Sequence, residues 1–259
     1  MKERNKMFPA RNINPLKVLS LIKLNTGKRT LTLYLKWFIL RRLESLPFIR
    51  TAVEYLQVVE SANLTKKREK TFIERISNHP GIYIDIGAHN GDTIYWARKA
   101  AMVIAIEPDT RCLPRIVAVA RKLKLKNFKL FTRVVGDGEE VEFAITAEGA
   151  INTGVNKLME IRKHSVIKKI KTKAYRLDEL LECLELPRPV LIKIDAEGME
   201  PLVLDGANKI LRCYKPTLLI ETHMNFSECL QRLEMLKVEI VEVIKRNNNQ
   251  VYIVAESRE

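Results

Sequence analysis

The sequence predicts an α/β fold built on a mostly parallel sheet. From residue 81 onward, short apolar runs alternate with segments of helical periodicity, which is the pattern of strand–helix–strand units. The apolar run at 82–86 also leads directly into a turn bounded by Gly87 and Gly91, and a helical segment follows that turn. A strand, a glycine-bounded turn and a helix in this order are typical of ligand-binding α/β proteins.

Apolar runs predict eight strands, and helical spacing between them predicts five helices. The strands are expected at 82–86, 102–106, 129–135, 140–145, 190–195, 217–222, 238–244 and 250–255. The helices are expected at 92–99, 110–123, 177–184, 200–212 and 226–236. Asp137-Gly138 is a hairpin-turn signal between two apolar runs, and Asp178 is expected to cap the helical run beside it. The chain ends in strand–turn–strand.

Residues 1–78 are expected to form a basic helical extension ahead of a catalytic domain at 79–259. The chain carries a net charge of +14, and the extension holds 17 Lys/Arg against 6 Asp/Glu, which is +11. Helical spacing recurs in the extension over 51–61 and 65–76. Because the domain itself is nearly balanced, this asymmetry indicates a negatively charged partner, either an anionic membrane or a nucleic acid.

One segment of the extension is a candidate for peripheral membrane contact. Residues 31–40 are mostly apolar, and cations flank them within 28–42. Ten residues span about 15 Å as a helix, half a bilayer core, so they do not form a transmembrane helix. Apolar side chains, a Trp and flanking cations suit a helix lying in the membrane interface. Packing on the catalytic domain or on a second subunit is the alternative, and the oligomeric state is left open.

Composition predicts a cytoplasmic globular protein. A hydrophobic content of 46% excludes a disordered or collagenous chain. The four cysteines lie far apart, without a C-x-x-C motif, and are expected to be reduced thiols. The N-terminus lacks the apolar core and cleavage site of a signal peptide. We therefore expect a cytoplasmic location, with attachment to the inner face of the membrane as an option.

The turn at 87–91 favours S-adenosylmethionine (SAM) over a dinucleotide. A dinucleotide site needs G-x-G-x-x-G, with a glycine close to the pyrophosphate, but His89 and Asn90 fill the middle of this turn. Asp92 would repel a pyrophosphate, whereas SAM has no phosphate and carries an ammonium and a sulfonium. Glu107 ends the next apolar run, 20 residues after the first glycine, about the offset at which an acidic residue meets ribose hydroxyls.

Four motifs together resemble the FkbM-type SAM-dependent methyltransferases. They are YIDIGAHNGDT at 83–93, AIEPD at 105–109, RLDEL at 176–180 and IKIDAEGMEPLVLDGA at 192–207. The resemblance covers a little over half the chain. It implies a Rossmann-like class I methyltransferase fold, with a mostly parallel sheet and a C-terminal antiparallel strand. It also implies methyl transfer to an oxygen, often of a sugar or a polyketide-like product.

The resemblance implies which residues bind SAM. The set is Asp85, Gly87, Ala88, His89, Asn90, Gly91, Glu107, Pro108 and Asp137. The first strand end and its glycine turn would contact the methionyl part, and Glu107 the ribose. Asp137 would lie near the adenine, with the hairpin turn as the alternative. His89-Asn90 replaces the small pair that the family often has, so the contact made by this part of the turn stays open.

Candidate catalytic residues lie where two later strands end. Asp195 and His223 each follow an apolar strand, and Glu197 lies in the turn after Asp195. A hydroxyl is a poor nucleophile at neutral pH, so a base or a metal helps. The same residue types suit Mg²⁺ or Mn²⁺, and the sequence leaves metal dependence undecided. As structural alternatives, Asp195 caps a helix or pairs with Lys193, Glu197 complements a helix dipole, and His223 is an ordinary hydrogen-bonded histidine.

The leading hypothesis is a SAM-dependent methyltransferase that methylates a hydroxyl on a glycan, a lipid-linked sugar or a related metabolite. An RNA methyltransferase is an alternative, motivated by the extension and by a basic run over 162–176. Nucleic acid is the less favoured partner, because aromatic residues are not interleaved with these basic runs. A non-catalytic membrane- or nucleic-acid-binding protein on the same fold is the third hypothesis.

Overall fold

The computed structural model describes residues 47–146, 150–152, 166–223, 225–247 and 250–257. The chain divides into two compact units, residues 1–54 and 55–259. Helix α3 (Pro47–Arg68) begins in the first unit, and the predicted membrane-contact segment at 28–42 lies outside the described residues. Among the helices that are described, none is long and apolar enough to cross a bilayer.

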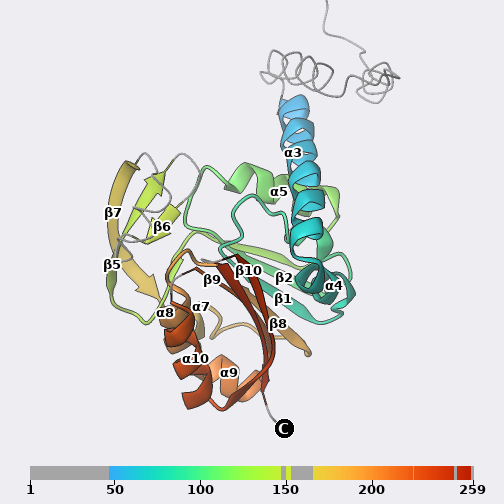
Figure 1. Cartoon of the computed structure of the whole chain (residues 1–259). Coiled ribbons are helices and arrows are strands. Elements are labelled where there is room, and N and C mark those ends of the chain that lie inside the picture. Colours follow the sequence, from blue (N-terminus) through green and yellow to red (C-terminus); the bar gives the residue numbers. More distant parts are fainter. Residues whose placement is uncertain (1–46, 147–149, 153–165, 224, 248–249, 258–259) are drawn as a thin grey trace, which may run out of the picture. The chain divides into compact units, whose positions relative to one another are not determined.

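A seven-stranded sheet forms the centre of the unit 55–259 (Figure 1). Its spatial order is β10 (Val238–Asn247), β11 (Gln250–Ser257), β9 (Thr217–Thr222), β8 (Val190–Ile194), β1 (Ile82–Ile86), β2 (Met102–Ile106) and β3 (Phe128–Phe131). The strands from β9 to β3 are parallel to one another. β11 is antiparallel to both β9 and β10. The predicted mostly parallel sheet with an antiparallel C-terminal strand is therefore confirmed.

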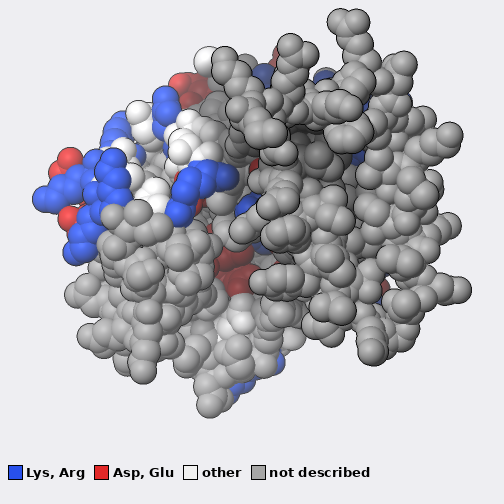
Figure 2. Space-filling view, turned by 90° about the horizontal axis from the view of Figure 1, so that it is seen from above, with Lys and Arg blue, Asp and Glu red and all other residues white. Residues whose placement is uncertain are grey.

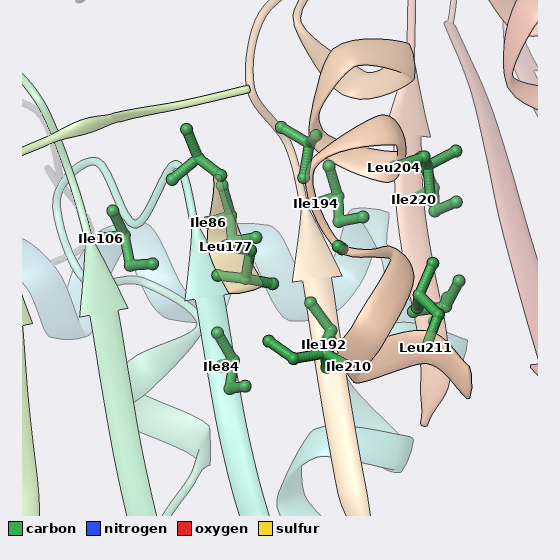
Figure 3. Packing of buried hydrophobic residues seen from close by; sticks show 14 of the residues in the cluster. Ile84, Ile86, Ile106, Leu177, Ile192, Ile194, Leu204, Ile210, Leu211 and Ile220 are labelled. Carbon is green, nitrogen blue, oxygen red and sulfur yellow. The ribbon is translucent and has the colours of Figure 1, made fainter. Parts of the chain in front are cut away.

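One face of this sheet packs on the helices of the C-terminal half. These helices are α7 (Leu177–Leu180), α8 (Glu200–Asp205), α9 (Asn208–Tyr214) and α10 (Phe226–Met235). Figure 3 shows strand residues such as Ile84 and Ile192 against Leu204 and Ile210 of the helices. Burial of each such side chain stabilises the folded state by about 1.5–3 kcal/mol. This layer therefore holds β1 and β8, and the ends of these strands, in place.

The opposite face packs on helices that precede or interrupt the first strands. They are α3, α4 (Lys70–Asn78), the 3₁₀ turn η1 (Ile94–Trp96) and α5 (Leu113–Lys122). Val58 of α3 and Phe72 of α4 are buried in this layer, and the Phe72 ring lies 5.0 Å from that of Tyr252 on β11. Residues 55–78 thus pack in the same compact unit as the sheet, and the boundary expected at residue 79 falls inside it.

A second, four-stranded sheet follows β3. Its order is β4 (Val134–Val135), β7 (Val166–Tyr175), β5 (Glu140–Thr146) and β6 (Ala150–Asn152). The single strand predicted over 129–135 is wrong, because this stretch splits into β3 and β4 in different sheets. The predicted hairpin at Asp137-Gly138 is also wrong, since β4 and β5 each pair with β7. β7 was missed because its exposed lysines alternate with inward residues and give a polar run.

Three predicted helices are shorter or interrupted in the structure. The helix expected over 177–184 ends at Leu180. The helix expected over 92–99 is reduced to η1. The helix expected over 200–212 divides into α8 and α9 around Gly206. A Cβ on Gly206 would lie 1.8 Å from the carbonyl oxygen of Gly136, so the close approach of the loop after β4 sets this break. Tertiary contact, rather than local propensity, decides where these helices end.

Candidate functional site

The site lies where the strand order of the large sheet reverses. From β1 the chain continues outward to β2 and β3 in one direction, and β8 and β9 extend the sheet in the other. In open α/β sheets, ligands bind at the carboxyl ends of strands on either side of such a reversal. β1 ends at Ile86 and β8 at Ile194. The turn that holds most of the predicted donor residues and the loop that holds Asp195 and Glu197 therefore follow adjacent strands.

Gly87 brings the two strand ends into contact. Its φ is +78°, and a Cβ at this position would lie 1.8 Å from the backbone oxygen of Asp195. The close approach means that only glycine fits here, since it lets the loop after β1 pack against the loop after β8. The SAM contact that the resemblance implies for Gly87 stays a prediction. Gly91 has a similar φ of +81°, but its nearest contact would be Cα of Ile116 at 3.4 Å.

The rest of the turn forms contacts to α3 and α5. Ala88 is buried, whereas His89 is exposed and has a positive φ of 46°. Asn90 Oδ1 accepts a hydrogen bond of 2.5 Å from Arg115, which also donates to Gln57 of α3. These side chains line a cavity of about 210 Å³. The Asn90 side chain therefore points toward α3 and α5. The sequence had left open which contact this residue makes.

Glu107 is held inside the loop network by the backbone. Its side chain is 4% exposed, and its two carboxylate oxygens accept N–H bonds of 2.7 Å from His89 and 2.8 Å from Asp109. Burial raises the pKa of Glu107, although the two N–H donors act in the opposite direction. Pro108 beside it is half-buried. Glu107 thus ties the end of β2 to the turn after β1, while its contact with a ribose stays a prediction.

Asp137 lies after β4 rather than in a hairpin. Its Oδ1 accepts the N–H of Glu139 at 3.2 Å, and Arg176 donates to its backbone carbonyl at 3.0 Å. Asp178 does not cap α7, because its carboxylate accepts the N–H groups of Lys209 and Ile210 at the start of α9. These contacts give both aspartates structural roles in the described part of the chain, and the adenine contact of Asp137 stays a prediction.

Asp195, Glu197 and His223 converge, as the strand ends predicted. One donor atom from each lies within 4.8 Å of the others. The His223 Nε2 atom is 3.6 Å from Glu197 Oε2 and 3.7 Å from Glu221 Oε1. The His223 imidazole thus lies beside two carboxyl groups, an arrangement that suits proton transfer. Two oxygens and one nitrogen are also a donor set that a divalent cation accepts.

The buried Lys193 forms an ion pair with the partly exposed Asp195, as one of the structural alternatives predicted. The Lys193 Nζ atom lies 3.0 Å from Asp195 Oδ2 and 3.7 Å from Asp85 Oδ1. Burial would raise the pKa of Asp195, but the Lys193 charge and hydrogen bond hold it below the usual range. Asp195 is therefore held as an anion by Lys193. It does not cap α8, whose N-cap residue is Met199.

Two further acids, Glu200 and Glu221, complete the site. Glu200 accepts the N–H groups of Ala196 and Gly198, each at 3.0 Å, and a hydrogen bond of 2.6 Å from Asn225. It thereby shapes the turn that carries Glu197. Its spacing after Asp195 in the motif is the only sequence signal for this role. Glu221 accepts a hydrogen bond from Gln250 and lies near the end of β9, two residues before His223.

Glu221 is expected to make stability depend on pH. Burial, followed by the nearby Asp195 charge, raises the pKa of Glu221 to about 9, whereas an unfolded glutamate titrates near pH 4.3. Between these values the folded state holds one more proton, so its stability is complete below pH 4.3 and falls by about 1.4 kcal/mol per pH unit as pH rises toward 9. Glu221→Gln has no proton to lose and should abolish this slope.

Urea unfolding at pH 5.5, 7 and 8.5 measures the effect of Glu221→Gln. The stability of the variant should exceed that of the wild type by an amount that grows with pH. Glu139→Gln, at an exposed site, is the matched control and should leave the pH dependence unchanged. Parallel stability curves for wild type and Glu221→Gln would contradict the raised pKa.

The fold and this site define a Rossmann-like methyltransferase of class I. A parallel sheet with an antiparallel strand at β11, a glycine turn after β1 and an acid after β2 are the features of that class. Within it, the chain belongs to the FkbM family, since the Methyltransferase FkbM domain matches residues 85–251. The resemblance found in the sequence motifs is therefore confirmed.

Solved structures of similar fold share little sequence with this chain. An FkbM methyltransferase from Methylobacillus flagellatus is 15% identical with a TM-score of 0.45, over 79% of this chain and 59% of that one. A precorrin-6y C5,15-methyltransferase from Geobacter metallireducens has the same identity and TM-score, over 73% and 86%. A putative Streptococcus mutans methyltransferase in complex with SAH is 12% identical, with a TM-score of 0.42, over 74% and 98%. No curated protein matches the sequence.

Proposed function

We propose that this chain is a SAM-dependent O-methyltransferase whose acceptor is a hydroxyl of a glycan, a lipid-linked sugar or a related metabolite. SAM supplies a methyl group already activated by a sulfonium. The turn at 87–91, with Asp85 before it and Glu107 beside it, would hold this donor. Acidic residues around the turn suit a ligand with an ammonium and a sulfonium, and they disfavour the pyrophosphate of a dinucleotide.

The observation that carries the proposal is the convergence of Asp195, Glu197 and His223 at the strand end next to the donor turn. Asp195, kept ionised by Lys193, would accept a hydrogen bond from a neighbouring hydroxyl of the acceptor and so orient the reacting oxygen. His223 Nε2 would take the hydroxyl proton as the oxygen forms its bond to the methyl carbon. The carbon–sulfur bond breaks, and its electron pair stays on sulfur. Glu197 would stabilise the imidazolium that results.

Positioning supplies most of the expected rate enhancement, because the leaving group is already activated. Removal of the hydroxyl proton by a placed base adds about 10²–10⁴-fold. A divalent cation held by the same three side chains is the alternative to proton transfer by His223. Methyl transfer that persists with a chelator favours the imidazole. Loss of transfer on chelation, with recovery on addition of Mg²⁺, favours the cation.

The basic run gives little support to the RNA alternative. Lysines on β7 are exposed, but Lys169 lies 3.4 Å from Glu142 and Lys173 lies 3.6 Å from Glu179. Figure 2 shows acidic side chains among the basic ones on this part of the surface. A face whose cations are paired in this way is typical of a solvated surface and offers less charge for phosphates. Membrane contact through residues 28–42 and a cytoplasmic location remain part of the proposal.

Calorimetric titration with SAM tests the proposed function. One molecule of SAM should bind per chain, and NAD⁺ should not bind, because the middle of the turn has no glycine and Asp92 would repel a pyrophosphate. Glu107→Gln should weaken SAM binding about 10-fold or more, since one charge-assisted contact to the ribose contributes about 1.5–3 kcal/mol. A folded protein that binds no SAM would overturn the proposal. The acceptor class follows from labelled-methyl transfer into fractions of a cell extract.

A further inference from the structure

A buried lysine lies between the donor half and the acceptor half of the site. Lys193 is 3% exposed, and its ammonium contacts both Asp85 and Asp195. Asp85 on β1 and Lys193 on β8 are direct partners in the parallel register, so they lie on the same face of the sheet. Lys193 thus links the strand that leads into the donor turn to the strand that leads to Asp195.

Packing alone does not explain a lysine at this position. The other residues of β8 are apolar and buried. Removing an ammonium group from water costs several kcal/mol, and replacing a buried ion pair by apolar side chains of similar volume is often neutral or stabilising. An interior lysine in an apolar strand therefore lowers the intrinsic stability of the core, which points to a role in the site.

The two carboxylates depend on Lys193 to different extents. Asp85 is fully buried and also accepts a hydrogen bond from Thr93, so it has a second anchor. The Asp195 side chain is 25% exposed, and Lys193 holds its Oδ2 atom at 3.0 Å. This ion pair leaves Oδ1 of Asp195 outside it. Loss of the ammonium group should release Asp195 more than Asp85.

We propose that Lys193 is a positioning residue that fixes the carboxylate of Asp195 for the acceptor. This role rests on the proposed methyl transfer. Lys193 acts through Asp195, because the buried ammonium group of Lys193 does not contact the acceptor itself. In-line transfer is sensitive to geometry, and a displacement of about 1 Å lowers the rate by about 10²-fold. A fixed Asp195 keeps the acceptor oxygen aligned with the donor, whose turn packs against the same loop through Gly87.

Variants of Lys193 separate positioning from stability. Lys193→Met removes the charge and keeps an unbranched stem, whereas Lys193→Arg keeps the charge. With labelled SAM and the extract fraction that the wild type methylates, Lys193→Met should lower kcat about 10²-fold and leave KM for SAM within a few fold. Lys193→Arg should recover part of the rate. The control Lys209→Met, which removes an exposed lysine 3.8 Å from Glu182, should keep the wild-type rate.

A second measurement needs neither acceptor nor turnover. The ¹³C NMR signal of the Asp195 carboxyl carbon, identified by its loss in Asp195→Asn, should shift in Lys193→Met and move back in Lys193→Arg. If Lys193→Met fails to fold, the double variant with Asp85→Asn, which removes both charges, replaces it in this comparison. An unshifted Asp195 signal would overturn the proposal.

The outcomes of the two measurements are distinct. A parallel loss of kcat and SAM affinity would assign Lys193 to the donor site, and a wild-type kcat in folded Lys193→Met would leave it a purely structural role. Either result overturns the positioning role. Failure of the proposed function has another signature, which is a wild-type protein that transfers no methyl group although the Asp195 signal still responds to Lys193.

Discussion

Asp195→Ala should reduce methyl transfer by about 10²–10⁴-fold and leave SAM affinity within a few fold. The Asp195 side chain lies just after the end of β8. One of its oxygen atoms lies within 4.8 Å of a donor atom of Glu197 and a donor atom of His223. Its ion pair with Lys193 keeps it anionic in a largely buried site. Alanine removes the group that orients the acceptor hydroxyl, whereas the donor turn keeps its own contacts through Glu107.

Single-turnover transfer of labelled methyl and calorimetric titration with SAM measure the two effects of Asp195→Ala separately. Asp195→Asn is the matched variant, since it keeps the shape and one hydrogen-bond acceptor but removes the charge. It should fall between the wild type and alanine in rate. Simultaneous loss of rate and SAM affinity in both variants would instead show that Asp195 supports the donor site or the fold.

Gly87→Ala should unfold the protein or destabilise it strongly. We expect a loss greater than the cost of ordinary overpacking, which is about 1–3 kcal/mol. The new Cβ would lie 1.8 Å from the backbone oxygen of Asp195, and no rotamer change can relieve an overlap with backbone. A positive φ adds about 1–2 kcal/mol for any residue with a Cβ. The loop after β1 would have to move away from the loop after β8.

Gly91→Ala is the control for the effect of backbone conformation at Gly87. Its φ of +81° nearly equals the +78° of Gly87, but its nearest new contact is an ordinary 3.4 Å. It should therefore cost about 1–2 kcal/mol. Urea unfolding gives both values, and their difference reports the contact between the two loops. Equal destabilisation by the two substitutions would show that this contact contributes nothing.

Periodicity predicted the strands that are buried on both faces, and it missed a strand that is exposed on one face. Strands β1, β2 and β9 have the bounds expected from their apolar runs. β7 is exposed on one face, where lysines pair with glutamates, so its polar side chains concealed a strand. The helix expected over 92–99 is a short 3₁₀ turn, because contacts in the surrounding structure decide its length.

The sequence placed the candidate catalytic residues at strand ends but did not predict the contacts between them. Strand ends pointed to Asp195, Glu197 and His223, since carboxyl ends of neighbouring parallel strands share one edge. The sequence could not show that Gly87 contacts Asp195 or that Lys193 reaches Asp85 as well as Asp195. These contacts join residues more than 100 positions apart. They depend on β8 lying next to β1, a neighbour relation that no local pattern encodes.

The sequence by itself determined the fold class and the family, because glycine turns, strand-end carboxylates and apolar periodicity are local properties of the chain. It also identified SAM as the expected donor from the charge and spacing of Asp92 and Glu107. Only the tertiary structure decided how Asp195 is held and which residues cap which helices. It also decided that the pKa of Glu221 is raised. Burial and the distance between charges create these properties, and both exist only once the strands are packed side by side.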